Sequence, residues 1–143
     1  MRTWKSDDGR STMFRVPEGA DLLEGLAEAV TELGVQAGWV QVIGAVKKVV
    51  LGYYDQTEKE YRLHEPEGRF EIASGLASIS MKDGAPFVHL HLTCSGEDGS
   101  AFGGHAMPGT IVFVAECFIT ELRGPAPERV MDESTGLALW PTA

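Results

Sequence analysis

Two histidines separated by a single residue offer the clearest chemistry in this sequence. His89 and His91 lie in the mainly apolar run 87–94, whose alternation is typical of a strand with one buried face. The even-numbered residues of this run are all apolar and form the face expected to pack in the core. Because alternate strand residues share a face, the two histidines project together from the other side. Two strand positions span roughly 6.6 Å, and imidazoles at that separation can converge on one ion.

A third histidine follows a short turn, in the sequence Gly103-Gly104-His105. If the loop between the two strands comprises residues 96–100, antiparallel pairing places His105 directly opposite His91, with His89 as a diagonal neighbour on the same face. A loop one residue shorter would turn His105 to the other face. The register of this hairpin therefore decides whether a third ligand is present.

Three imidazoles on one patch are typical of a catalytic-style zinc site, in which water takes the fourth position. Copper, nickel, cobalt and iron also accept nitrogen ligands. We therefore predict that His89, His91 and His105 bind one divalent transition metal ion, with zinc as the first choice. The alternative, which the sequence leaves open, is that these histidines only line a half-exposed sheet or an interface between subunits.

Two carboxylates are candidates for catalytic work beside such a metal. Glu116 interrupts the apolar run 111–119, and a carboxylate buried there would need an arginine, a histidine or a metal as partner, or would be protonated. Glu71, between Phe70 and Ile72, is a weaker signal of the same kind. The alternatives without chemistry are a salt bridge between subunits for Glu116 and contact with water for Glu71.

One helix and a series of strands must position these side chains. Asp21 with Glu24 three residues later is typical of a helix N-terminus, and Gly34 is typical of the following C-terminus. Strand patterns occupy 11–16, 39–54, 60–64, 70–79, 87–94, 101–107 and 110–122, with a change of phase near Ser74 that indicates a bulge. One helix leading into a run of strands predicts an α+β protein with a largely antiparallel sheet.

Composition and charge exclude several classes of protein. The 143 residues and 15.5 kDa fit a single domain, 1–143, with a normal globular composition. A formal net charge of −9 argues against unaided DNA binding, which depends on clustered basic residues. The longest apolar runs are too short to span a membrane, and the polar start lacks a secretory signal, so we expect a cytoplasmic protein. Cys94 and Cys117 are expected to be reduced, buried thiols.

Six short motifs resemble, in order and spacing, the plants-and-prokaryotes-conserved (PPC) domain, and in particular its bacterial and archaeal members. The resemblance covers about residues 11–123 and leaves 124–143 as a C-terminal extension, whose apolar segment 137–140 has no assigned role. The motifs are Gly68-Arg69-Phe70-Glu71-Ile72, Ser78-Ile79-Ser80, Asp83-Gly84-Ala85-Pro86, His89-Leu90-His91, Asp98-Gly99 and Gly103-Gly104-His105.

The resemblance implies a strongly curved antiparallel sheet with one main helix, assembled as a homotrimer. It also implies that the metal site proposed for prokaryotic members corresponds to His89, His91 and His105. The family carries a DNA-binding label, but this chain lacks the Arg-Gly-Arg-Pro core of an AT-hook. The first hypothesis is therefore a small trimeric module that binds a metal or a small molecule. The alternatives are a zinc-dependent hydrolase-like enzyme and a DNA-associated regulator whose partner supplies the basic surface.

Overall fold

The computed structural model of the protein describes residues 1–142. Within these residues one helix and eleven strands follow one another along the chain. In chain order they are β1 (Thr3–Lys5), β2 (Ser11–Val16), α1 (Leu22–Leu33), β3 (Gly38–Lys48), β4 (Leu51–Asp55), β5 (Glu60–His64), β6 (Phe70–Lys82), β7 (Ala85–Ser95), β8 (Ala101–Ala106), β9 (Ile111–Glu121), β10 (Val130–Asp132) and β11 (Leu137–Leu139). No helix of the described part is long and apolar enough to cross a membrane.

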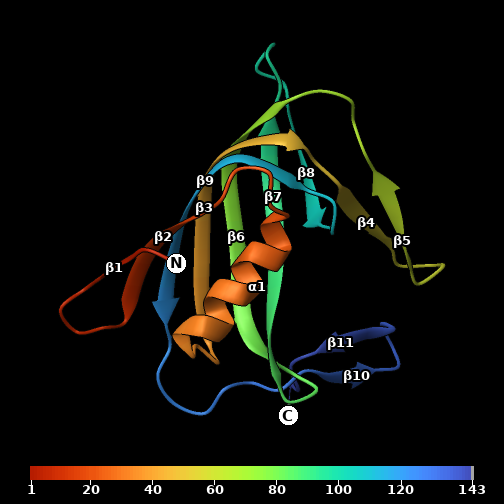
Figure 1. The fold of residues 1–143 in the computed structure, drawn as a ribbon. Coiled ribbons are helices and arrows are strands. Elements are labelled where there is room, and N and C mark those ends of the chain that lie inside the picture. Colours follow the sequence, from red (N-terminus) through yellow and green to blue (C-terminus); the bar gives the residue numbers. More distant parts are fainter. Residues whose placement is uncertain (143) are drawn as a thin grey trace.

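Nine strands form one sheet in the order β1-β2-β9-β3-β6-β7-β8-β4-β5, while β10 and β11 pair separately. Each of these strand pairings is antiparallel. The large sheet is curved, α1 lies across one face of its central strands, and the β4–β5 and β10–β11 hairpins stand to one side (Figure 1). The predicted α+β class, with a curved antiparallel sheet and one main helix, is confirmed.

Helix α1 begins and ends where its capping residues predict. The Asp21 side chain accepts hydrogen bonds from the backbone N–H groups of Leu23 (2.9 Å) and Glu24 (3.1 Å), which have no partner inside the helix. Gly34 adopts a left-handed conformation with φ 71°, which stops the helix at little steric cost. The inner face of the helix buries Leu22, Leu26, Ala29 and Val30 against the sheet.

The two faces of the large sheet differ in cover. Strand residues that point toward α1 form the core, and Val40, Leu90 and Val112 are all 0 % exposed. The opposite surface, which we call the open face, has no helix over it in the described chain. One row of directly paired residues crosses this open face and contains Trp4, Met13, Phe118, Gln41, Leu76, His91 and His105, in that order. Its apolar members remain substantially exposed, from 37 % for Phe118 to 52 % for Trp4.

Irregularities in the strands account for changes of phase in the sequence. The register between β6 and β7 shifts between Ile72 and Ser74, so the predicted bulge near Ser74 is confirmed. The region 39–54 is divided into β3 and β4 by a short break at the buried residues Val49 and Val50. Strands β1, β10 and β11 were not expected from the sequence. They are only three residues long and lie outside the regions of clear alternation.

Candidate metal centre

The β7–β8 hairpin places all three histidines on the open face. Strand β7 ends at Ser95 and β8 begins at Ala101, so the loop has the five residues 96–100 and His91 pairs directly with His105. The register predicted for a five-residue loop is therefore confirmed. Within the loop, an Asp98 carboxylate oxygen accepts hydrogen bonds from the Ser100 backbone N–H (2.9 Å) and hydroxyl (2.6 Å). This turn chemistry stabilises the loop length that brings the third histidine to its position.

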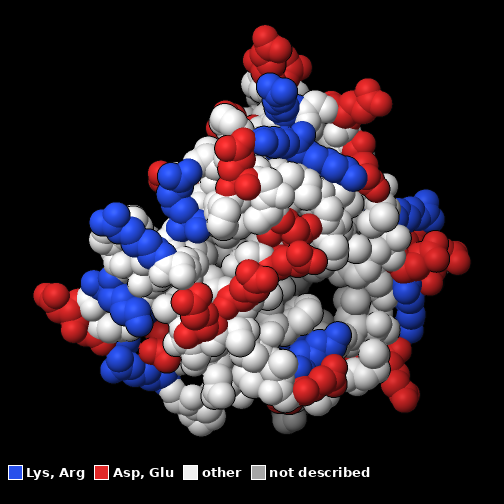
Figure 2. Space-filling view, viewed as in Figure 1, with Lys and Arg blue, Asp and Glu red and all other residues white. Residues whose placement is uncertain are grey.

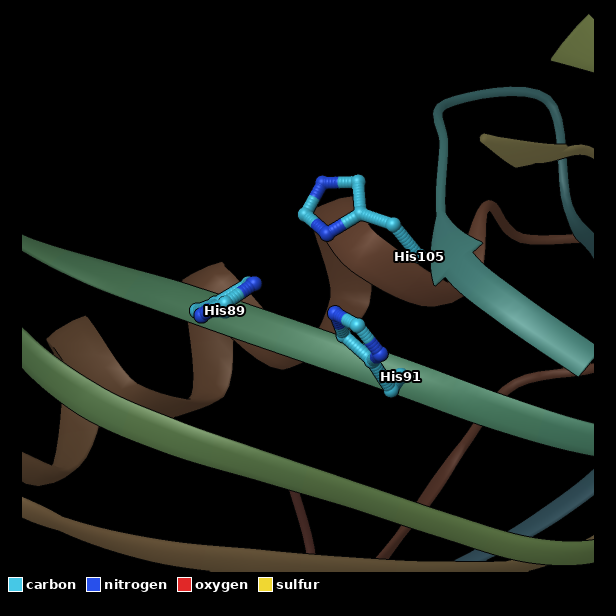
Figure 3. A group of neighbouring side chains, drawn as sticks. All are labelled: His89, His91 and His105. Atoms are coloured by element: carbon cyan, nitrogen blue, oxygen red, sulfur yellow. The ribbon is translucent and has the colours of Figure 1, made fainter. Parts of the chain in front are cut away.

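The three imidazole rings converge on one small space (Figure 3). The ring centroids of His89 and His91 lie 5.0 Å apart, those of His89 and His105 5.0 Å, and those of His91 and His105 5.4 Å. One ring nitrogen from each histidine lies within 4.8 Å of the other two. Nitrogens around one tetrahedral zinc ion stand about 3.3 Å apart, given metal–nitrogen distances of about 2.0–2.1 Å. Small side-chain rotations would bring these rings to that separation.

Burial makes two of these histidines suitable ligands. Loss of contact with water lowers the pKa of His89 and of His105 to about 4, and neighbouring cationic groups add to the effect. Both rings are therefore neutral near pH 7, the form that binds a metal. Within residues 1–142, the Nδ1 atom of His105 is buried and has no hydrogen-bond partner. A buried ring nitrogen without a hydrogen-bond partner fits a metal ion at the centre of the group.

Side chains distant in sequence surround this group. Tyr61 on β5 stacks on the His105 ring, with centroids 5.0 Å apart and planes 29° apart. Arg129, which lies just before β10, places its Nη2 atom 3.4 Å from Nδ1 of His89. Sequence reasoning missed both residues, because neither lies in a motif with chemical spacing. A single arginine in the proline-containing tail was the only available signal for Arg129.

The structure does not bring either carboxylate candidate into the histidine group. Glu116 lies on the open face and is exposed in the single chain, so the expectation that it is buried within the chain was wrong, while a salt bridge between subunits stays a prediction. The run 111–119 is apolar on both faces, but α1 covers only one of them. Glu71 is also exposed, and it pairs with Ser95 at the end of the β6–β7 ladder away from His89. Among the described residues, the candidate metal group consists of histidines alone.

The remaining sulfur and imidazole groups stay outside this centre. Cys94 and Cys117 are buried free thiols, as predicted, and burial raises the pKa of Cys94 to about 11 and that of Cys117 to about 12. His64 at the end of β5 is exposed and packs edge-on against Phe102, with centroids 5.8 Å apart. His64 therefore lies outside the histidine group and can serve as a control in experiments on it.

Solved structures with the same fold include two proteins with high sequence identity. A metal-containing protein from Archaeoglobus fulgidus is 41 % identical, with a TM-score of 0.88 over 99 % of each chain. A plant- and prokaryote-conserved protein from Pyrococcus horikoshii is 39 % identical, also with a TM-score of 0.88, over 94 % of this chain and 93 % of that one. A protein from Bacteroides thetaiotaomicron, described only provisionally as DNA-binding, shares the fold at 20 % identity, with a TM-score of 0.87 over 97 % of this chain and 96 % of that one.

Sequence comparisons give the family. Two cyanobacterial relatives, named bifunctional protein GlmU in two Synechococcus strains, are 33 % and 32 % identical over 125 residues, or 86 % of this chain. The chain spans about a fifth of the length of these curated relatives. Residues 5–123 match the sequence model of the Plants and Prokaryotes Conserved domain, abbreviated PCC or PPC. This match covers most of the chain, which therefore belongs to the Plants and Prokaryotes Conserved domain family.

Proposed function

We propose that this protein is a cytoplasmic, trimeric metal-binding module in which His89, His91 and His105 hold one divalent transition metal ion, with zinc as the first choice. The observation that carries the proposal is the convergence of three imidazoles around the buried, unpartnered Nδ1 atom of His105. The relative from Archaeoglobus fulgidus, described as metal-containing, supports it. A bound divalent ion would act as a Lewis acid toward a small-molecule ligand at its remaining position.

Assembly as a homotrimer is proposed from the open face. Trp4, Met13, Leu76 and Phe118 form an apolar surface that a monomer would leave in water, and such surfaces commonly mark interfaces. A cavity of ≈ 480 Å³ lies among these residues and would accept side chains of another subunit. The number three comes from the family resemblance. Because His91 pairs directly with Leu76, the metal site would lie beside the subunit interface.

A binding role fits the histidine group better than hydrolysis does. Hydrolysis at such a metal needs a general base near the ligand, and among the described residues the group contains no carboxylate. The chain's own residues can hold the ion and exclude water from part of its surroundings. We therefore place metal or ligand binding ahead of the hydrolase-like alternative.

Direct DNA binding is the less favoured alternative. The chain carries 12 basic and 21 acidic residues, and Figure 2 shows a diagonal row of acidic side chains over α1. Such a surface repels phosphates, whereas DNA binders attract them with basic patches. A regulator of this type would need a partner that supplies positive charge. A gel shift with the purified chain, expected to show no tight complex at physiological salt, tests this point.

Metal analysis of purified protein tests the proposed site. The wild-type protein, stripped with a chelator and refilled with zinc, is expected to retain about one ion per chain after desalting. His91→Ala and His105→Ala should lose most of it, because two imidazoles bind zinc much more weakly than three. His64→Ala is the matched control and should retain the wild-type content. Equal zinc content in all four proteins would refute the site.

Light scattering tests the assembly separately. A trimer of the 15.5 kDa chain is expected at micromolar concentration. Phe118→Glu, which places a charge on the exposed apolar row, should shift the protein toward monomer while its circular dichroism remains unchanged. A wild-type protein that is already monomeric would contradict the proposed trimer without affecting the metal site.

A further inference from the structure

The C-terminal extension forms one wall of the histidine site, although it lies outside the matched domain 5–123. The backbone of Met81 at the end of β6 donates to the Pro127 carbonyl (2.9 Å) and accepts from the Arg129 N–H (2.8 Å). The turn of the β10–β11 hairpin is held by the β4–β5 hairpin, since the Tyr54 hydroxyl donates to the Thr135 carbonyl at 2.6 Å. The molecular surface is hollowed between these two hairpins and β7 (Figure 2). The extension is thus fixed in place beside an accessible site.

Arg129 is the residue that this wall presents to the histidines. Only 9 % of it is exposed, and its guanidinium carbon lies 5.1 Å from the centroid of the Phe87 ring and 5.4 Å from that of Trp140. Its Nε donates to the Ser80 hydroxyl at 2.9 Å, and its Nη1 donates to the Ala138 carbonyl at 3.0 Å. Aromatic faces and neutral oxygens therefore position the guanidinium but do not neutralise it.

The charge of Arg129 has no counter-ion among residues 1–142. The ion pairs of this part of the chain all involve other residues. A buried cation without an anion is costly, and burial accordingly lowers the pKa of Arg129. A divalent ion held by three neutral histidines would add two more positive charges beside it. The filled site would therefore carry a local charge of about +3, which the described residues leave unbalanced.

The hydrogen-bonding capacity of the guanidinium is also incompletely used. Arginine has five N–H donors: Ser78, Ser80 and Ala138 accept three of them, and Nδ1 of His89 can accept a fourth only while that nitrogen carries no proton. The contact with His89 is the longest of the four, at 3.4 Å, and depends on which nitrogen of that ring carries the proton. At least one donor, on Nη1, therefore has no acceptor among the described residues.

We propose that the histidine site binds its metal together with a small oxyanion, a carboxylate or phosphate group, whose charge is neutralised by Arg129. This inference rests on the proposed metal-binding function and adds the chemical class of the ligand. The oxyanion would occupy the position that three histidines leave open on the metal. A charge-assisted hydrogen bond from a planar guanidinium is well suited to carboxylate and phosphate oxygens.

Cobalt-substituted protein provides the test, because the visible spectrum of Co²⁺ changes when the open position gains a ligand. The full chain is loaded with Co²⁺ and titrated with acetate in one arm and with inorganic phosphate in the other. In the wild-type protein we expect a saturable spectral change with at least one of them. The anion that reaches half-saturation at the lower concentration shows whether the site prefers a carboxylate or a phosphate. In Arg129→Gln, half-saturation should require at least tenfold more anion while cobalt content is retained.

Arg10→Gln is the matched control, since it removes the same charge from an exposed ion pair with Asp8. It should titrate as the wild type does. If Arg129→Gln does not load cobalt, a second titration of the cobalt-loaded wild-type protein tests the proposal. Acetate is then expected to bind at least tenfold more tightly than acetamide, which is neutral. Three results would overturn the proposed oxyanion ligand: an unchanged spectrum in the cobalt-loaded wild-type protein, equal anion affinity in Arg129→Gln and the wild type, or equal affinity of the wild type for acetate and acetamide. Wild-type protein that takes up no cobalt would instead refute the proposed function, and the oxyanion with it.

Discussion

The two faces of the large sheet consist of the same strands, yet they carry different kinds of residue for different reasons. Toward α1, the alternate residues are aliphatic and fully buried, as Leu90 on β7 illustrates. On the open face, the neighbours of Leu90 are His89 and His91, and the same row continues into exposed apolar side chains. Because side chains alternate along a strand, neighbouring residues of β7 belong either to the buried core or to the candidate metal site.

The difference between the two faces follows from which of them is covered by other parts of the chain. Helix α1 removes one face from water, so the residues there are mostly apolar and close-packed. Among the described residues, the open face is covered only near one end, where Arg129 of the C-terminal extension contacts His89 and Tyr61 of β5 stacks on His105. Partial cover lowers the pKa of His89 and His105 without closing the group to a ligand. The candidate metal site thus lies at the edge of a covered region, between full burial and full exposure.

Truncating the adjacent residues Leu90 and His91 of β7 should give the largest difference in the free energy of unfolding between the two faces. Leu90→Ala leaves a cavity in the core and is expected to lower the free energy of unfolding by about 2–5 kcal/mol. His91→Ala, on the open face, should lower that of the metal-free protein by less than about 1 kcal/mol. Urea unfolding of chelator-treated protein measures both values. Similar losses for the two variants would show that the open face is as tightly packed as the core.

Metal binding should stabilise the protein through the open face alone. With free zinc at 100 times its dissociation constant, the free energy of unfolding should rise by about 2.7 kcal/mol, because only the folded chain assembles the three ligands. His105→Ala should lose most of this gain, whereas His64→Ala should keep it. Thermal unfolding with and without added zinc is the measurement. Stabilisation that survives in His105→Ala would place the ion elsewhere.

The metal-free protein should also lose stability in mild acid. The pKa of His89 and His105 is about 4 in the folded chain, below the ordinary 6.5. Between these values the unfolded chain binds protons that the folded chain does not. The free energy of unfolding therefore contains the full contribution of these two histidines above pH 6.5, and this contribution falls as the pH drops toward 4. Replacing His89 with Gln should reduce this slope, and replacing His64 with Gln should not. Urea midpoints from pH 4 to 8 provide the comparison, and identical slopes for wild type and His89→Gln would contradict the burial of this ring.

Local rules were sufficient to predict much of the covered face and part of the site. The strand 11–16 and the helix caps at Asp21 and Gly34 depend on neighbouring residues, and the structure has them as predicted. The position of His105 opposite His91 followed from the length of one loop. Each of these features is determined by alternation, capping or turn chemistry within a few residues.

Contacts between distant segments could not be predicted in the same way. Arg129 reaches Ser80 across 49 residues, and nothing in the sequence near either residue indicates the other. Glu116 was misjudged because its apolar neighbours on both sides suggested burial on both faces. An apolar strand shows that a face is suited to burial, but only the tertiary structure shows whether anything covers it.

The smallest effect concerns the cap that begins the covering helix. Asp21→Ala removes the acceptor for the N–H groups of Leu23 and Glu24, and also the carboxylate oxygen that accepts from the Gly109 N–H before β9. The expected loss is about 1 kcal/mol in the free energy of unfolding, typical of a helix N-cap, and Asp21→Asn should lose less because its amide oxygen still accepts. Urea unfolding measures both variants, and zinc content should stay at the wild-type value because the cap serves the covered face. A parallel loss of zinc would show that the two faces are coupled through the helix rather than separated by strand alternation.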